Sequence, residues 1–356
     1  MIIRNFGKLE DEQSTGLYIL KNNKGMSAVV TNYGASLVSL NVPDRNGTMV
    51  DVVLGYDNVT GYERGDAFLG GTIGRVANRI GKGRFTLNGR EYRLTVNDGE
   101  NTLHGGRDPY SLRLWDVKMP ISSSILDDTM DGKITFCLES PDGDQGFPGN
   151  LHLEVSYILS NEGSLIIEYK AISDADTPIG FTNHSYFNLN GHDSGSILGH
   201  VAQIKANQYT ATDSGMLPTG ALVNVEDTPM DFRKPKMLGA DIHADYGALK
   251  FGKGYDHNYV VGGTGNGEGF KEIARLFSHD TGIIMKVLTD MPGVQFYTAN
   301  NLHDQAGKGG TVYGPHSGVC FETQFWPDTV NKESFPGGIL RSGEIFISKT
   351  EYRFSC

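Results

Sequence analysis

Alternation of apolar and polar residues with a period of two recurs along the whole chain, and it restricts the possible folds more than any other feature. Over residues 151–157, Leu151, Leu153, Val155 and Tyr157 alternate with polar residues, and residues 165–171 repeat the pattern. A period of two places the apolar side chains on one face of a β-strand. Sustained helical periodicity is missing from the sequence. The pattern therefore predicts an all-β chain whose antiparallel sheets pack as a sandwich or a barrel.

Turn signals divide these segments into hairpins. The polar residues 160–163 separate the two segments just described, and Asn88-Gly89 separates alternating residues at 85–87 and 92–96. Asn-Gly between such segments is typical of a two-residue hairpin turn. Further strands are expected over residues 35–42, 283–287 and 344–348, and short helices around 58–64 and 237–246. The glycine-rich stretch Gly262–Gly269 is expected to be an exposed loop between strands.

Composition agrees with many tight turns and excludes several classes of function. Glycine accounts for 47 of the 356 residues, and no linker divides the chain, so we expect one domain over residues 1–356. The net charge is -11, and the absence of a basic stripe argues against nucleic-acid binding. No run of 18 apolar residues predicts a membrane span, and the first residues lack the apolar core of a signal peptide.

The number and spacing of the cysteines argue against a bound cofactor or metal. The sequence also lacks the known nucleotide-binding and hydrolase motifs. Cys137, Cys320 and Cys356 are too few and too scattered for a disulfide framework or a zinc site. The stretch Gly262–Gly269 does not fit G-x-G-x-x-G, and neither a P-loop, G-x-S-x-G nor H-E-x-x-H occurs. The simplest interpretation is a cytoplasmic protein that needs no cofactor and no metal.

Six polar clusters stand out in otherwise apolar, turn-rich surroundings. Their residue ranges are 74–80, 97–106, 182–189, 255–258, 292–297 and 320–328. Asn, Asp, Gln, His and Arg side chains in such clusters suit sugar hydroxyls, which both donate and accept hydrogen bonds. Aromatic neighbours such as Tyr186, Phe187, Phe296 and Trp326 would be apolar walls of a site or part of the core.

Glu322 is the most informative residue of these clusters. It follows the apolar residues 319–321, and a carboxylate in such a strand is costly to bury without a partner. A structural ion pair with Arg75 or Arg79 is the alternative to a catalytic role. The two histidines also have structural alternatives to a catalytic role. His104 could be a loop residue that bonds to backbone groups, and His184 a buried, hydrogen-bonded histidine at a strand end.

Taken in order, the clusters resemble the aldose 1-epimerase family over nearly the whole chain. The matching segments are GRVANRI at 74–80, NTLHGG at 101–106, NHSYFNLNG at 183–191, YDHN at 255–258, PGVQFYTAN at 292–300 and ETQFWPDTVN at 322–331. The resemblance implies a large antiparallel β-sandwich of the galactose-mutarotase-like, or supersandwich, type. It also implies an isomerase that interconverts the α and β anomers of free aldohexoses such as galactose and glucose.

The resemblance further assigns roles to individual residues. It implies that Glu322 is the general base and His184 the general acid, with His104 assisting beside the sugar. The substrate-binding residues that it implies are Asn78, Arg79, His104, Ser185, Tyr186, Asp256 and Gln295. The partner would be a small monosaccharide, and the protein a monomer by default, with a dimer possible. Attraction between an ionised glutamate and a protonated histidine is expected to lower the pKa of Glu322 and to raise that of His184.

Two other functions compete with this interpretation. A hexose-6-phosphate 1-epimerase uses the same chemistry but needs additional basic residues around the sugar C6 position. A non-catalytic carbohydrate-binding β-sandwich could keep aromatic walls and polar ligands, but has no need for a glutamate opposed by two histidines.

Overall fold

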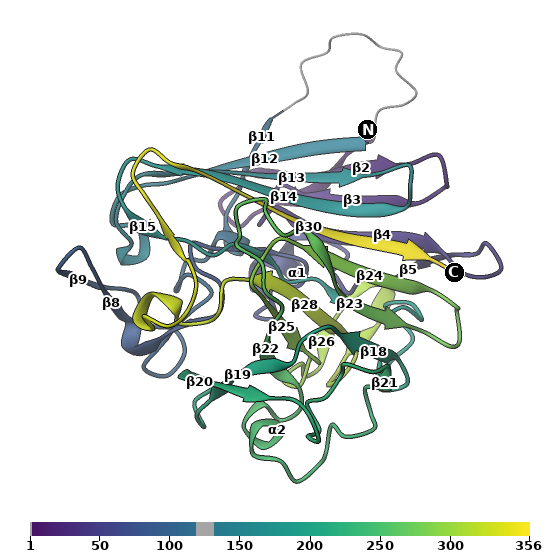
Figure 1. Cartoon of the computed structure of the whole chain (residues 1–356). Helices are drawn as coiled ribbons and strands as arrows, with labels where there is room; N and C mark the ends of the chain where they lie inside the picture. Colours follow the sequence, from purple (N-terminus) through teal and green to yellow (C-terminus); the bar gives the residue numbers. More distant parts are fainter. Residues whose placement is uncertain (1, 119–131) are drawn as a thin grey trace.

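The computed structural model describes residues 2–118 and 132–356, and three antiparallel sheets contain most of the strand residues (Figure 1). The nine-stranded sheet has the order β11 (Asp116–Lys118), β12 (Gly132–Ser140), β13 (Leu151–Leu159), β14 (Ser164–Ser173), β30 (Ile345–Ser355), β24 (Ile284–Thr289), β23 (Lys271–Phe277), β18 (Val201–Ile204), β21 (Lys236–Met237). The six-stranded sheet has the order β17 (Tyr186–Phe187), β28 (Val319–Gln324), β25 (Gly293–Tyr297), β22 (Asp256–Val260), β19 (Gln208–Thr212), β20 (Pro218–Asn224). The five-stranded sheet contains β1 (Ile2–Lys8), β2 (Ser14–Lys21), β3 (Ser27–Thr31), β4 (Ser36–Pro43) and β5 (Met49–Asp51).

Two-stranded ribbons and short helices connect these sheets. The ribbons pair β6 (Thr72–Ile73) with β16 (Thr182–Asn183), β7 (Arg79–Ile80) with β10 (Thr102–Leu103), β8 (Arg84–Leu87) with β9 (Arg90–Arg93), β15 (Thr177–Pro178) with β29 (Ile339–Leu340), and β26 (Gln305–Ala306) with β27 (Val312–Tyr313). The α-helices are α1 (Val59–Arg64) and α2 (Gly247–Gly252), and single 3₁₀ turns occur at Gly81–Gly83, Tyr110–Leu112, Asp144–Gly146, Lys308–Gly310 and Thr329–Asn331. No helix within the described ranges is both long and apolar enough to cross a bilayer.

The predicted alternation and hairpins are confirmed. β13 and β14 pair from Leu151↔Ser173 to Leu159↔Leu165, and their predicted apolar faces are buried. β8 and β9 pair around Asn88-Gly89, and both turn residues have the positive φ that a type I′ turn requires. The strands expected at 35–42, 283–287 and 344–348 and the helix at 58–64 are also present, and Gly262–Gly269 is a mostly exposed loop.

The helix predicted over residues 237–246 is wrong. The segment forms successive turns after β21, and α2 begins only at Gly247. Its backbone makes separate turn hydrogen bonds, such as that from the Ala244 N–H to the Asp241 carbonyl, in place of a continuous helical series. The N–H groups of Leu238 and Gly239 donate to a neighbouring segment, at the carbonyls of residues 200 and 198. Leu238 and Ile242 are buried, and their spacing of four residues imitated a helical face.

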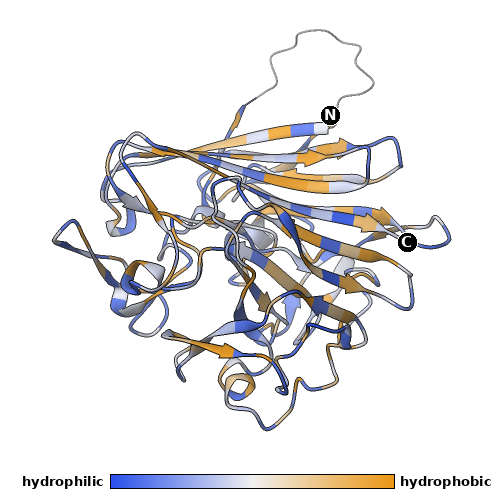
Figure 2. Ribbon diagram, in the orientation of Figure 1, coloured by the Kyte–Doolittle hydropathy of each residue, from blue (hydrophilic) through white to orange (hydrophobic). Residues whose placement is uncertain are grey.

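The main core lies between the nine-stranded and the six-stranded sheet, with the strands of the former forming one layer in Figure 1. Tyr352 of β30 contacts Phe187 with a ring separation of 4.8 Å and donates a hydrogen bond to the Phe321 carbonyl. On the other flank, Tyr18 of β2 packs edge-on against Phe136 of β12. Figure 2 shows hydrophobic and hydrophilic residues alternating along these strands. The sheets therefore pack as a sandwich, which the alternation alone did not distinguish from a barrel.

Candidate active site

The polar face of the six-stranded sheet builds the site. Glu322 of β28 lies opposite Gln295 of β25, and Gln295 lies opposite Asn258 of β22. Paired residues of neighbouring strands share a face, so these three side chains form one polar row. Their neighbours Phe321 and Phe296 point to the other face and pack against each other in the core. The alternation that builds the core thus also directs Glu322 away from it.

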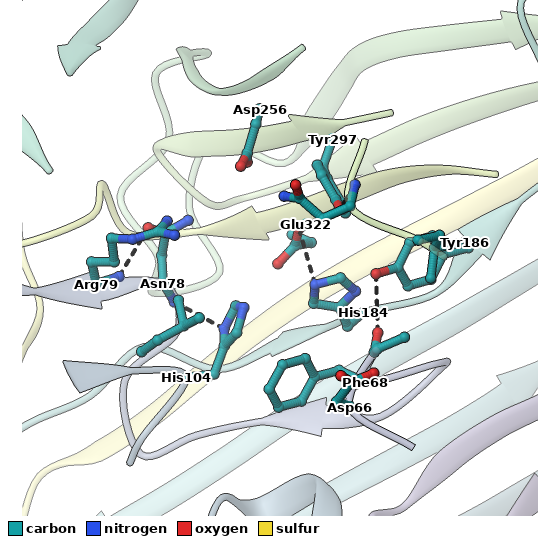
Figure 3. Close-up of a pocket in the computed structure, with 14 residues that line it drawn as sticks. Asp66, Phe68, Asn78, Arg79, His104, His184, Tyr186, Asp256, Tyr297 and Glu322 are labelled. Carbon is teal, nitrogen blue, oxygen red and sulfur yellow. Dashed lines mark hydrogen bonds and ion pairs between the residues drawn. The ribbon is translucent and has the colours of Figure 1, made fainter. Parts of the chain in front are cut away.

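A cavity of about 240 Å³ lies over one end of this row (Figure 3). This volume is near the lower limit of ligand pockets, which hold roughly 300–1,000 Å³, and suits a small ligand. The residues lining it are Asp66, Ala67, Phe68, Asn78, Arg79, Leu103, His104, His184, Tyr186, Asp256, Tyr297, Asn301, Leu302 and Glu322. They come from segments far apart in the sequence, which the three sheets and the β7–β10 ribbon bring together.

Glu322 and His184 face each other in this cavity. Glu322 Oε1 lies 3.7 Å from His184 Nε2, and both side chains are almost completely buried. The alternative ion pair with an arginine is not formed. Arg75 donates to the carbonyls of residues 140, 148 and 149, and Arg79 Nε donates to Asp98 Oδ2 at 2.7 Å. The carboxyl group in the apolar strand therefore faces an imidazole and not an arginine.

His104 lies beside this pair in a defined tautomer. Its Nδ1 accepts a hydrogen bond from the Asn78 backbone N–H at 3.2 Å, so a neutral His104 carries its proton on Nε2. The rings of His104 and His184 are 5.3 Å apart and nearly perpendicular. His104 Nε2–H is thus available as a donor to an oxygen in the cavity.

This tautomer also bears on metal binding. Single ligand atoms of His104, His184 and Glu322 lie within 4.8 Å of one another, which is close enough for a shared ion. A histidine that binds a metal normally donates its other ring N–H to an acceptor. The Nδ1 of His104 instead faces a donor, so its Nε2 lone pair is not available to an ion. The three groups are better suited to donating and accepting protons than to holding a metal.

Burial controls the ionisation of the facing pair. It lowers the pKa of His184 to about 4, and it raises the pKa of Glu322 well above its usual value. Asp256 raises the pKa of Glu322 further, and Arg79 opposes this effect. The expectation that mutual attraction lowers the pKa of Glu322 and raises that of His184 is therefore wrong. Loss of hydration is the largest cause of both shifts, and it favours the neutral forms of both groups.

Several lining residues have a left-handed backbone. The φ angles of Phe68, Asn78 and His104 are 56°, 60° and 52°, respectively. Asn and His tolerate this region better than most residues, whereas for a bulky side chain it is unusual. Such conformations concentrate at functional sites, where the surrounding structure holds them. Here the turns direct Asn78 and His104 into the cavity, and the Phe68 ring contacts His104 and His184 at centroid distances of 4.9 and 5.8 Å.

Most of the residues expected to bind substrate lie at the cavity, and two do not. Asn78, Arg79, Asp256 and Tyr186 line it, although the Tyr186 hydroxyl donates to the Ala67 carbonyl. Gln295 lies behind the wall, where its Nε2 donates to Asp256 Oδ1 at 2.6 Å. The hydroxyl of Ser185 is buried and donates to Asn183 Oδ1. Gln295 can therefore orient Asp256, whereas Ser185 supports its own segment.

Sequence reasoning missed the other half of the wall. Leu103 and Tyr297 lie within the segments that resemble the family, but the resemblance assigns them no role. Asn301 directly follows the segment at 292–300. Asp66 and Phe68 precede the first segment, and no residue pattern marks them as part of a site. Only the approach of separate loops in space identifies these residues. Of the expected aromatic walls, Phe187, Phe296 and Trp326 belong to the buried interior and do not line the cavity.

The fold and site define a β-sandwich protein with a buried carboxyl–imidazole pair in a small polar cavity, an arrangement suited to acid–base chemistry on a sugar. Comparison with known proteins makes this specific. The family model described as aldose 1-epimerase matches residues 16–353. The chain belongs to the aldose 1-epimerase family and is a carbohydrate isomerase.

Relatives are similar over almost their whole length. The chain is 40% identical to a galactose mutarotase of Mus musculus over 98% of this chain and 97% of that protein. It is 37% identical to an aldose 1-epimerase of Escherichia coli over 97% and 96%, respectively. A solved structure of an aldose epimerase homologue from C. elegans superposes with a TM-score of 0.85, at 30% identity over 96% of this chain and 99% of that one. The galactose-mutarotase-like fold expected from the sequence is thus confirmed.

Proposed function

We propose that this protein interconverts the α and β anomers of free aldohexoses such as galactose and glucose, with Glu322 and His184 as the proton-transfer pair. The observation that supports this most strongly is the distance of 3.7 Å between His184 Nε2 and Glu322 Oε1 at the cavity wall. Mutarotation acts on two oxygens bonded to one carbon, the anomeric hydroxyl and the ring oxygen. An acid and a base that serve both oxygens must themselves be close neighbours.

The reaction then needs only proton transfer. Ionised Glu322 removes the proton of the anomeric hydroxyl while protonated His184 donates a proton to the ring oxygen. The bond between C1 and the ring oxygen breaks, C1 becomes an aldehyde, and rotation about C1–C2 presents its other face. Closure reverses both transfers. Each positioned acid or base contributes roughly 10²–10⁴-fold, so two contribute about 5–11 kcal/mol of the barrier.

The neutral pair favoured by burial fits this cycle. While the sugar is open, Glu322 holds the proton of the anomeric hydroxyl and His184 has lost its own. Burial thus favours the protonation state of the open-chain stage. Moving one proton from Glu322 to His184 produces the state that opens a ring, and the count of protons on the pair does not change.

Other lining residues would hold the sugar. In this proposal, His104 donates from Nε2 to a sugar oxygen, and Asn78, Arg79 and Asp256 bind ring hydroxyls. Gln295 acts through its hydrogen bond to Asp256. The site uses residues of one chain, so a monomer suffices for this function. Three free cysteines are in keeping with a cytoplasmic location.

The cavity is better suited to a free sugar than to a sugar phosphate. Its lining includes three carboxyl groups, on Asp66, Asp256 and Glu322, against one arginine, and Arg79 is already paired with Asp98. A phosphate on C6 would add negative charge to these surroundings without a free cation among the lining residues.

Polarimetry with freshly dissolved sugars tests the proposal. The rate of equilibration of α-galactose and α-glucose should rise in proportion to enzyme concentration, and that of glucose 6-phosphate should respond far less. Preference for the phosphate would support a hexose-6-phosphate 1-epimerase. Binding of galactose without acceleration would support a non-catalytic carbohydrate-binding protein.

A further inference from the structure

A second cluster of ligating side chains lies on the outer face of the nine-stranded sheet. Cys137 of β12 pairs with Glu154 of β13, and Glu139 pairs with His152 in the same register. Their neighbours along both strands, such as Phe136 and Leu153, are buried in the core. Because side chains alternate between the faces of a strand, the four polar groups point away from the core and from the active-site cavity.

The donor atoms have the separations of a metal site. One ligand atom each of Cys137, His152 and Glu154 lies within 4.8 Å of the others. His152 Nε2 and Glu154 Oε1 are 3.5 Å apart. Tetrahedral zinc with bonds of roughly 2.0–2.3 Å places its ligand atoms about 3.3–3.8 Å apart. The nitrogen and oxygen already meet this requirement, and the sulfur lies within 4.8 Å of both.

A supporting group orients the histidine as a ligand. His152 Nδ1 donates to Glu139 Oε1 at 2.5 Å, so a neutral imidazole presents the lone pair of Nε2 towards Glu154. A carboxylate that accepts from the non-ligating nitrogen is the usual support of a metal-bound histidine. His104 in the active site has the opposite arrangement, because its Nδ1 faces a backbone donor.

The surroundings leave room for a cation. The side chains of His152 and Glu154 are 38% and 20% exposed, so an ion can enter from solvent. Lys118 Nζ donates to Glu154 Oε1 at 2.8 Å, and its side chain is 60% exposed, which allows the ammonium to move aside. Asp116 lies opposite Cys137 on β11 and adds negative charge to the same row.

We propose that Cys137, His152 and Glu154 form a surface site for a thiophilic divalent cation of the zinc class, with Glu139 as the supporting carboxylate. Sulfur, imidazole and carboxylate ligands together favour such ions over magnesium or calcium. Binding converts the Cys137 thiol to a thiolate and releases its proton to solvent. Water completes the coordination. The ion would join β12 to β13, and it stabilises the folded protein by mass action.

Titration of the EDTA-treated full-length protein with Co²⁺ and Zn²⁺ tests this site. We expect a cobalt–thiolate charge-transfer band that saturates at one ion per chain, and an increase in Tm with Zn²⁺. Cys137→Ser should abolish the band, and His152→Gln should weaken Zn²⁺ binding at least 10-fold. Glu139→Gln should weaken it roughly 10–100-fold. Cys356→Ser, which removes an exposed thiol elsewhere, is the matched control and should bind as the unmodified chain does.

Two further measurements separate this site from the catalytic cluster. The titrations are repeated in the His184→Asn background, where an ion at the active site is disfavoured, and the cobalt band should persist there. Mutarotation by Cys137→Ser and His152→Gln should match that of the unmodified protein, which also shows that both variants fold. A cobalt–thiolate band that survives Cys137→Ser, or Zn²⁺ affinity unchanged in both variants, overturns the proposal.

Discussion

At the scale of single residues, the central feature is a carboxyl group and an imidazole whose ionisation is set by burial. Glu322 and His184 are both nearly inaccessible to water, and burial moves their pKa values towards the neutral forms. In this account, the pair is active when it holds one proton in total. A second proton blocks the base, and loss of the proton removes the acid.

The pH dependence of kcat/KM follows from these directions. On the acid side, activity should fall near pH 4, where His184 in the neutral pair takes up a second proton. On the alkaline side, it should fall at a pH well above the usual range of a glutamate, because the pKa of Glu322 is raised. A stopped-flow or polarimetric profile of kcat/KM in the free enzyme measures both limbs.

Variants of the two histidines assign the acid limb. His184→Asn should depress the rate and remove the limb near pH 4 from the residual activity, whereas His104→Asn should lower the rate and retain the limb. The opposite result would exchange the roles of acid and helper between these histidines. Since His104 Nδ1 accepts from Asn78, His104 is placed as a donor in either case.

At the scale of elements, alternation carried most of the information in the sequence. It predicted β13, β14 and the β8–β9 hairpin, whereas the apolar residues 319–321 indicated the strand that contains Glu322. The helical spacing of two buried residues was misleading at residues 237–246, which form turns. A local pattern cannot distinguish a continuous helix from successive turns that also donate hydrogen bonds to a distant segment.

Some residues of the candidate site could be predicted from the sequence, and others could not. Residues inside the matching segments, such as Asn78 and His104, could be predicted, because family resemblance assigns them together. Phe68 and Asn301 could not, since their places in the wall depend on how loops approach in space. The directions of the pKa shifts of Glu322 and His184 could not be predicted either. They depend on how deeply the two groups are buried, which the sequence does not give.

The β8–β9 hairpin offers a direct test of the turn assignment. Gly89 has a φ of 77° and open space around the position of a Cβ, so Gly89→Ala introduces backbone strain without a clash. We expect a loss of about 1–2 kcal/mol in the free energy of unfolding. Gly247→Ala, at the first residue of α2 and also in open space, is the control and should be neutral or slightly stabilising. Equal effects of the two changes in urea denaturation would contradict the assigned turn.

At the scale of the whole molecule, buried histidines couple folding to pH. Burial lowers the pKa of His200 and His257 to about 4. His200 Nε2 accepts from the Leu189 N–H and His257 Nδ1 from the Asp256 N–H, and protonation would break both hydrogen bonds. The unfolded chain therefore binds more protons than the folded chain between about pH 6.5 and 4.

Stability should accordingly fall as the pH decreases through this range. Each such histidine contributes a slope of about 1.4 kcal/mol per pH unit in the free energy of unfolding. His200→Gln should reduce the total slope by one such contribution, whereas His303→Gln, on the surface, serves as the matched control. Urea denaturation at a series of pH values measures both. A slope that is unchanged in His200→Gln would show that this histidine is not held neutral by the fold.

In the proposed mechanism, the sandwich holds one carboxyl group beside one imidazole in the cavity that binds the sugar, and Glu322→Gln tests this claim most directly. The variant keeps the shape of the side chain and removes the base. Polarimetry on freshly dissolved α-galactose should show a rate at least ~10²-fold below that of the unmodified protein. The exposed change Glu344→Gln should leave the rate unchanged, and both variants should unfold as the unmodified protein does. Near-normal turnover by folded Glu322→Gln would contradict the account.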